Sequence, residues 1–212
     1  MHAVVVAGSM ISEELDRAAL ADSDLLVAVD GGADVLARAG LVPSLLVGDL
    51  DSISAAARSD LEAKGVEILV LPTAKDETDT EAALRAVVDR GATDITVFAA
   101  LGGPRLDHLL GNLLVLTAPW LAEVRVTLAD GLHEVFLVKG DAVVTGRPGD
   151  IVSLLPLTPV VEHVQTQGLL YPLGGEPLLQ AQTRGVSNEM TADEARVTHG
   201  AGSLLLIHYR GR

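Results

Sequence analysis

Short apolar runs alternate with amphipathic segments as far as about residue 128. The runs have the length of buried strands and lie at 2–7, 25–29, 45–47, 66–71, 94–99 and 124–128. Between them helical spacing recurs, as in 77–90, where Leu84, Val87 and Val88 share one side. Strands that alternate with helices are typical of α/β folds, so we predict a mostly parallel six-stranded sheet with flanking helices.

The segment 106–116 carries a second clear helical pattern. Four of its leucines lie at helical spacing: Leu106, Leu110, Leu113 and Leu114. We expect this helix, like the one over 77–90, to cover a face of the sheet with its apolar side.

The pattern changes after residue 130. Short apolar runs are now separated by turn signals such as RPGD at 147–150 and GGEP at 174–177. Runs of this kind favour antiparallel β structure. We therefore predict two domains, an α/β domain over 1–130 and an antiparallel β domain over 131–212.

Composition narrows the partners of the chain. With 212 residues and 49% hydrophobic content the protein is globular. Its 29 acids against 15 bases give a net charge of −14, which argues against nucleic acid or an anionic membrane as the main partner. The absence of cysteine excludes thiolate metal sites, and carboxylates favour magnesium-like ions. The start resembles no signal peptide, and no run approaches the roughly 20 apolar residues of a membrane helix, so we expect a cytoplasmic protein.

Polar segments follow the second to fifth predicted strands. They read DGGAD at 30–34, GDLDS at 48–52, PTAKDETDTE at 72–81 and LGGPRLDH at 101–108. The carboxyl ends of parallel strands meet at one edge of the sheet, where α/β folds bind ligands. These segments contain Lys75 and Arg105 as their only lysine and arginine, and they bring the following acids toward this edge: Asp30, Asp49, Asp51, Asp76, Glu77, Asp79 and Asp107. So many carboxylates repel one another unless they are protonated or bridged by a cation, which predicts a divalent metal.

Each segment alone also fits a structural role. DGG fits a turn, Thr78 and Glu81 fit a capping box that would leave Asp79 serving only the helix dipole, and Asp107 fits the start of a helix. GDLDS fits a purely structural role less well than the other segments, because two acids separated by one residue repel each other without a local structural benefit. Four structural coincidences at one edge are less plausible than one shared site.

Glycines and bases beside these acids indicate phosphate chemistry. Four glycines leave backbone N–H groups open to phosphate oxygens: Gly31, Gly32, Gly102 and Gly103. Lys75 and Arg105 would supply positive charge to the same anion. No G-x-x-x-x-G-K-[ST] motif is present, so the chain is not a Walker P-loop enzyme.

The motifs together resemble those of the thiamine pyrophosphokinases, also called thiamine diphosphokinases. The resemblance rests on DGGAD, GDLDS, KDETDTEAAL and GGPRLDHLLGN, followed by GLLYPL at 168–173 and GVSNE at 185–189, and it spans essentially the whole chain. It implies an ATP- and Mg²⁺-binding α/β catalytic domain, a thiamine-binding β-sandwich and a homodimer. The implied reaction transfers the pyrophosphoryl group of ATP to the hydroxyl of thiamine, giving thiamine diphosphate and AMP.

The resemblance also implies roles for individual residues. The magnesium ligands would be Asp49, Asp51, Asp76 and Asp79. The ATP-binding residues would be Asp30, Gly31, Gly32, Lys75, Gly102, Gly103 and Arg105. The residues with catalytic roles would be Lys75, Asp51, Asp79, Arg105 and Asp107, of which Asp107 would orient or deprotonate the attacking hydroxyl. Thiamine would be contacted by Tyr171, Ser187 and Asn188.

Two features depart from the family pattern. Some members hold the thiamine rings with a tryptophan, but the only one here, Trp120, lies outside the C-terminal motifs. Tyr171 either takes that role or belongs to the core of the β domain. Pro104 separates Gly103 from Arg105, where a GGR sequence is expected, and this leaves the direction of Arg105 open.

Other classes remain as alternatives. A DxD pair after a strand also occurs in haloacid-dehalogenase-like phosphatases and in metal-dependent glycosyltransferases, but neither accounts for GVSNE or KDETD. The phosphatases further require their acid pair after the first strand, where this chain reads AGSMIS at 7–12. A nucleotide- or thiamine-binding protein of the same fold without turnover is the third alternative.

Overall fold

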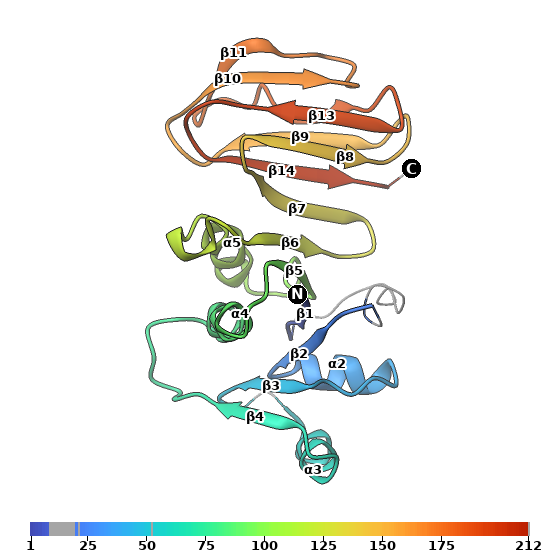
Figure 1. Ribbon diagram of the computed structural model, residues 1–212, viewed down its shortest axis with the longest axis vertical. Helices are drawn as coiled ribbons and strands as arrows, with labels where there is room; N and C mark the ends of the chain where they lie inside the picture. Colours follow the sequence, from blue (N-terminus) through green and yellow to red (C-terminus); the bar gives the residue numbers. More distant parts are fainter. Residues whose placement is uncertain (9–19, 21, 52, 212) are drawn as a thin grey trace. The chain divides into compact units, whose positions relative to one another are not determined.

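The computed structural model describes residues 1–8, 20, 22–51 and 53–211 (Figure 1). Most of the AGSMIS segment and Ser52 of GDLDS lie outside the described residues. The chain divides into two compact units, Met1–Gly131 and Leu132–Arg212. They are called unit 1 and unit 2 below.

Unit 1 is built on a parallel sheet. Its strands are β1 (His2–Val6), β2 (Leu25–Val29), β3 (Leu45–Gly48), β4 (Glu67–Val70), β5 (Asp94–Phe98) and β6 (Arg125–Ala129). They lie in the order β6-β5-β1-β2-β3-β4, and every pairing between them is parallel. Such a sheet is covered on both faces, so its central strands are runs of buried residues, as in β1 and β3. The predicted six-stranded parallel sheet is confirmed.

Helices cover both faces of this sheet. They are α2 (Gly32–Arg38), α3 (Ala55–Ala63), α4 (Asp79–Asp89) and α5 (Leu106–Val115), with a 3₁₀ turn, η1, at Pro119–Leu121. The α2 helix packs on β1 and β2 and contacts α3, while α4 packs on β1, β2 and β3 and contacts α5. Figure 1 shows the two pairs on opposite sides of the strands. On the α2 side, Val4 and Val6 of β1 pack with Leu36 of α2 and Leu61 of α3.

The expectation for α5 is wrong for three of its four leucines. Leu106, Leu110 and Leu114 are 65%, 49% and 58% exposed in unit 1. The buried residue of the helix is Asn112, whose Nδ2 donates to the carbonyl of Ala100 at 2.9 Å. The helix carries leucines on two sides, so helical spacing alone could not tell which side faces the sheet.

Unit 2 is an antiparallel sandwich. Its strands are β7 (His133–Val138), β8 (Asp141–Thr145), β9 (Ile151–Pro156), β10 (Val160–Gln167), β11 (Gly174–Leu179), β12 (Asn188–Glu189), β13 (Glu194–Thr198) and β14 (Leu204–Tyr209). One sheet has the order β12-β9-β14-β7 and the other β11-β10-β13-β8. Their inner faces share a core in which Val152 and Leu204 of the first sheet pack with Val161 and Val197 of the second. The predicted antiparallel second domain is confirmed.

We predict that Gly32→Ala destabilises unit 1. A Cβ at Gly32 would lie 1.9 Å from the carbonyl oxygen of Val6, a backbone atom of β1 that cannot move aside. We expect a loss of about 1 to 3 kcal/mol in the free energy of unfolding, the range seen for overpacking. The measurement is urea unfolding followed by the fluorescence of Trp120.

The matched control is Gly111→Ala in α5. Among the described residues, no atom outside the local helix lies within 4 Å of a Cβ built there, so alanine should stabilise the helix by up to about 1 kcal/mol. Equal unfolding midpoints for the two variants would contradict the close packing of α2 on β1.

Candidate active site

Asp30 forms the centre of the acidic edge of unit 1. It follows β2 directly, adopts a positive φ of 42°, and its backbone N–H donates to the carbonyl of Val47 at 3.0 Å. Its side chain is nearly buried, at 9% exposure, and Oδ1 accepts a hydrogen bond from the backbone N–H of Leu50 at 3.1 Å. The DGGAD segment is therefore bound to the GDLDS loop through one carboxylate.

This contact requires glycine at position 48. Gly48 has a φ of 153°, and a Cβ there would lie 1.8 Å from Oδ1 of Asp30. No side chain fits such a gap. The close approach of the Asp30 carboxylate thus explains the glycine of GDLDS, for which sequence analysis predicted no role. In the sequence, only the position of Gly48 directly before the pair Asp49 and Asp51 indicated that this glycine could matter.

The loop that carries Asp49 and Asp51 is held at a second point. The N–H of Asp51 donates to Oδ1 of Asp49 at 3.2 Å. Further along, the N–H and Oγ of Ser54 donate to the carboxylate of Asp34 at 3.2 and 2.8 Å. Asp34 is a positioning residue that sequence reasoning missed, although it is the last residue of the quoted DGGAD motif.

Lys75 and Asp79 form the third part of the edge. The Lys75 Nζ lies 2.9 Å from Oδ1 of Asp79 and donates to the carbonyl of Pro72 at 3.1 Å. Asp79 begins α4, and Oγ1 of Thr78 accepts from the N–H of Glu81 at 3.2 Å, so the expected N-cap hydrogen bond is present. Asp79 therefore serves the helix start and also holds the lysine. Asp76 lies beside them on the surface.

The pKa shifts of Asp30 and Lys75 show that the charged side chains of this edge interact with one another. Burial and, to a smaller extent, the charges of Asp79, Asp49 and Asp51 together raise the pKa of Asp30 to about 6, against the hydrogen bond from Leu50, which lowers it. The pKa of Lys75 is raised by its hydrogen bond to Asp79 and by the charges of Asp49 and Asp30. Four acids and one lysine from three loops are thus close enough to affect one another, as the parallel topology predicts.

The chemistry of this edge suits a hard divalent cation. Burial is the main cause of the raised pKa of Asp30, and the negative charges of Asp79, Asp49 and Asp51 add to it, so a cation at this edge would offset part of the shift. Carboxylate oxygens are also the ligands that Mg²⁺ prefers. Among the residues that the structure describes, no three acidic or histidine side chains are already arranged as a metal-binding set. The carboxylate oxygens of this edge are suitable ligands for the ion. One of these carboxylates, that of Asp79, forms an ion pair with Lys75.

Arg105 and Asp107 form a separate pair. Nε and Nη2 of Arg105 donate to the two carboxylate oxygens of Asp107 at 2.9 and 2.6 Å. This fork lowers the pKa of Asp107 to about 2. Both side chains are exposed, as are Gly102 and Gly103, and Gly103 adopts a φ of 95° before Pro104. Arg105 is therefore directed at its neighbour within its own loop.

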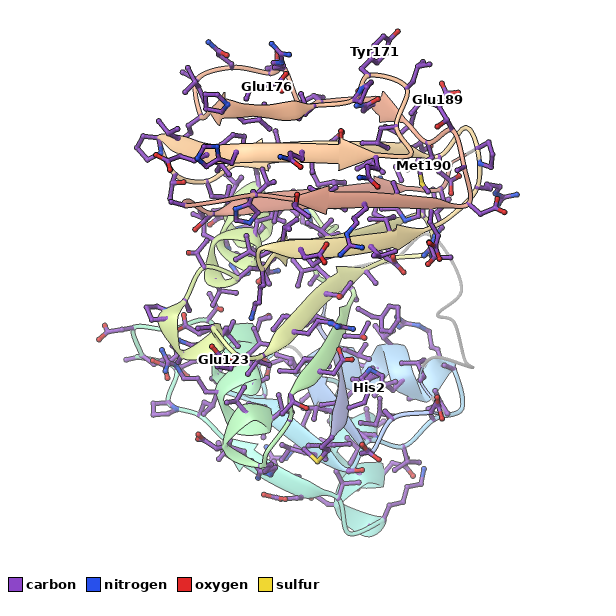
Figure 2. The ribbon with its side chains drawn as sticks, turned by 45° about the horizontal axis from the view of Figure 1, so that its top comes forward. His2, Glu123, Tyr171, Glu176, Glu189 and Met190 are labelled. Carbon is purple, nitrogen blue, oxygen red and sulfur yellow. The ribbon has the colours of Figure 1, made fainter. Side chains whose placement is uncertain are left out.

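In unit 2 the candidate thiamine residues meet at β12. Nδ2 of Asn188 donates to the carbonyl of Tyr171 at 2.7 Å, and the N–H of Tyr171 donates to Oδ1 of Asn188 at 3.0 Å. Ser187 has a φ of 61°, and its N–H donates to Oγ of Ser153 at 3.0 Å. Tyr171 is 68% exposed and projects from unit 2 (Figure 2), so its alternative as a core residue is excluded.

The fold and the acidic edge define a two-domain protein, with a parallel α/β unit suited to metal and phosphate and an antiparallel β unit. Residues 17–128 match the catalytic domain of thiamin pyrophosphokinase, and residues 141–204 match its vitamin B1 binding domain. The chain therefore belongs to the thiamine pyrophosphokinase family. No helix among the described residues is long and apolar enough to cross a membrane.

Similar proteins and solved structures support this family assignment. A thiamine pyrophosphokinase of Bacillus subtilis (strain 168) is 26% identical over 193 residues, which cover 86% of each chain. The crystal structure of thiamine pyrophosphokinase from Bacillus subtilis matches with a TM-score of 0.89 at 25% identity over 100% of both chains. That of thiamin pyrophosphokinase from Geobacillus thermodenitrificans matches with a TM-score of 0.83 at 27% identity, covering 99% of this chain and 97% of the other.

We predict that Asp30→Asn stabilises the protein in a pH-dependent way. The folded pKa of about 6 lies above the ordinary 3.8, so ionised Asp30 opposes folding. This penalty is absent below about pH 4 and complete well above about pH 6. Because asparagine stays neutral and keeps an oxygen for the Leu50 N–H, the variant should gain about 2 to 3 kcal/mol at about pH 8 relative to about pH 4.

The measurement is urea unfolding at both pH values in the presence of a chelator. Asp60→Asn is the control, because Asp60 lies on the exposed side of α3 and pairs with Lys64. The control should show no comparable change between the two pH values. A stability difference between wild type and the Asp30→Asn variant that is the same at about pH 4 and about pH 8 would contradict the raised pKa.

Proposed function

We propose that this protein transfers the pyrophosphoryl group of ATP to the hydroxyl of thiamine and releases AMP and thiamine diphosphate. The observation that carries the proposal is the convergence of Asp30, Asp49, Asp51 and Asp79 around Lys75 at the carboxyl edge of the sheet. Membership of the thiamine pyrophosphokinase family supports the same reaction.

Mg²⁺ would be held by the carboxylates of this edge. Asp49, Asp51 and Asp79 are the proposed ligands, with Asp76 beside them as a ligand or orienting group. When bound, the ion would neutralise the negative charge that develops on the phosphate oxygens. The chain itself contributes the spacing of these carboxylates, which Asp30 and Asp34 fix by holding the two ends of the loop at 49–54.

The phosphates would lie against backbone N–H groups and two basic side chains. Gly31, half-buried, and Gly32, buried against β1, stand at the start of α2, and the exposed Gly102 and Gly103 stand before α5; the N–H groups at the start of a helix favour anions. Lys75 would supply a compact positive charge and Arg105 a fork of donors. Positioning and charge neutralisation provide most of the catalysis expected for phosphoryl transfer.

Asp107 would orient Arg105 rather than accept a proton. A carboxylate with a pKa of about 2 is a weak base at neutral pH. Its two hydrogen bonds to Arg105 instead fix the plane of the guanidinium. Of the two roles that the resemblance implies for Asp107, the orienting role is the one we propose, with the guanidinium as the group it orients.

Thiamine would bind unit 2 at the segment around β12. The exposed ring of Tyr171 offers a stacking surface, and Ser187 and Asn188 offer neutral hydrogen-bonding groups for an aminopyrimidine. Thiamine is a cation, so the net charge of −14 favours its approach.

A homodimer is the assembly we propose. Leu106, Leu110 and Leu114 form an exposed apolar stripe along α5 in unit 1, and the only ionisable residues of that helix are Asp107 and His108. A second copy of the same helix would cover this stripe across a twofold axis without bringing many like charges together.

We predict that Asp51→Asn abolishes the reaction. The purified protein is incubated with ATP, Mg²⁺ and thiamine, and AMP and thiamine diphosphate are quantified, with each component omitted in turn. The wild type should form both products in equal amounts. Asp51→Asn removes a charged metal ligand and should lower turnover by about 100-fold or more. Asp60→Asn should retain full activity.

The products distinguish the alternatives. ADP or phosphate in place of AMP would indicate a kinase of another type or a phosphatase. Binding of ATP or thiamine without any product would indicate a binding protein that lacks turnover. Full activity of Asp51→Asn would exclude Asp51 from metal binding.

We predict that Leu110→Glu dissociates the homodimer. Two copies of the new carboxylate would face each other in an apolar interface, so association should weaken by at least about 100-fold. Light scattering coupled to size-exclusion chromatography measures the mass. Ala56→Glu adds the same charge at an exposed position of α3 and should leave the dimer intact. A wild-type protein of monomeric mass would overturn the proposal.

A further inference from the structure

Unit 2 contains a buried ionisable pair that the proposed reaction does not use. His208 of β14 is fully buried and Asp150, at the start of β9, is 2% exposed. Nε2 of His208 lies 3.2 Å from Oδ2 of Asp150. Nδ1 of the same ring lies 3.7 Å from Oε2 of Glu134, beyond normal hydrogen-bonding distance. Burial of such groups costs free energy, so their retention calls for a physical reason.

Charged residues lie on both sides of the pair, next to His208 and next to Asp150. Glu134 of β7 also accepts a hydrogen bond from Nη2 of Arg210 at 2.7 Å, and His208 and Arg210 both lower the pKa of Glu134. On the other side, the N–H of Arg147 donates to Oδ2 of Asp150 at 3.1 Å, while its guanidinium Nε lies 3.8 Å from Oδ1. Oδ2 of Asp150 therefore lies between a backbone donor of the turn and the ring of His208.

The turn at 146–150 is closed tightly over this pair. A Cβ at Gly146 would lie 2.6 Å from Oδ2 of Asp150, 2.9 Å from Nε2 of His208 and 3.0 Å from Sδ of Met190. The backbone of the same turn is joined to Met190 in both directions. The N–H of Met190 donates to the carbonyl of Asp150 at 2.8 Å, and the N–H of Gly149 donates to the carbonyl of Met190 at 2.9 Å.

Met190 connects this turn to the candidate thiamine residues. It directly follows β12, whose Asn188 holds the backbone of Tyr171 through its side-chain amide. The N–H of Leu170 also donates to the carbonyl of Glu189 at 2.8 Å. Figure 2 shows Tyr171, Glu189 and Met190 at the same end of unit 2. Because β12 has only two residues, its ladder with β9 is too short to fix this segment alone.

We propose that His208 and Asp150 are positioning residues for thiamine, which fix the turn at 146–150 and through Met190 place Asn188 and Tyr171. This inference rests on the proposed function, since it assigns the thiamine site to the segment around β12. Neither residue would touch thiamine. The carboxylate–imidazole contact defines one position for Asp150, and the reciprocal hydrogen bonds with Met190 transmit that position to β12.

The test compares His208→Gln and Asp150→Asn with the control Asp141→Asn. Asp141 is a carboxylate of the same unit, but it pairs with Arg196 on the exposed surface of β8 and β13. We expect KM for thiamine to rise about tenfold in the first two variants, with kcat and KM for ATP changed by less than about twofold. The control should keep all three constants. The shape of asparagine at 150 keeps packing intact, so this variant guards against a failure of His208→Gln to fold.

A second readout does not depend on turnover. The side-chain amide resonances of Asn188 should shift in both variants of the buried pair and stay unchanged in Asp141→Asn. A merely structural role would lower the unfolding midpoint but leave KM for thiamine and the Asn188 amide of the folded protein unaltered, and that result would overturn the inference. A wild type that forms no thiamine diphosphate would refute the proposed function and, with it, the thiamine role of this pair. The Asn188 amide would then still decide whether the pair positions β12.

Discussion

The contact between the Asp30 carboxylate and the backbone of the GDLDS loop determines the rest of the acidic edge. It places a nearly buried negative charge against Gly48 and the N–H of Leu50, within the field of three further carboxylates. Burial raises the pKa of Asp30 in the folded chain, and repulsion from these carboxylates adds to the shift. The repulsion is small enough for the fold to tolerate, because one hydrogen bond and a glycine-sized gap accommodate the carboxylate.

The two units hold their candidate binding segments by different means. In unit 1, parallel strands bring loops to one edge, and hydrogen bonds accepted by the carboxylates of Asp30 and Asp34 fix those loops relative to one another. In unit 2, the segment at β12 has only a two-residue ladder, and its position depends on the turn at 146–150, which closes over a buried pair. The polar groups of β12 can bind a small ligand only if their position is fixed. Because the strand is too short to fix them by its own ladder, contacts from inside the sandwich must do so.

Sequence analysis predicted the features that depend on a local pattern of residues, and it missed the features that depend on contacts between residues far apart in the chain. The six strands of unit 1 were found because each is a short apolar run between polar loops, and the Thr78 cap because its partner is three residues away. The side of α5 that faces the sheet was not found, because its leucines occupy two sides. Gly48 and Asp34 act on groups about 20 residues distant, and His208 lies 58 residues from Asp150, so no spacing in the sequence could reveal them.

The charge of the edge also constrains the form in which ATP could bind. A free polyphosphate would meet four carboxylates and one lysine, and that lysine is already paired with Asp79. Arg105 is likewise neutralised by Asp107. Repulsion would then dominate over the N–H groups of the glycine loops. In the proposed reaction, therefore, the edge accepts a polyphosphate only together with its cation, whose charge would compensate the carboxylates and leave Lys75 available to the phosphates. In the proposed reaction, the excess of acids around Asp30 would be the feature that makes nucleotide binding metal-dependent.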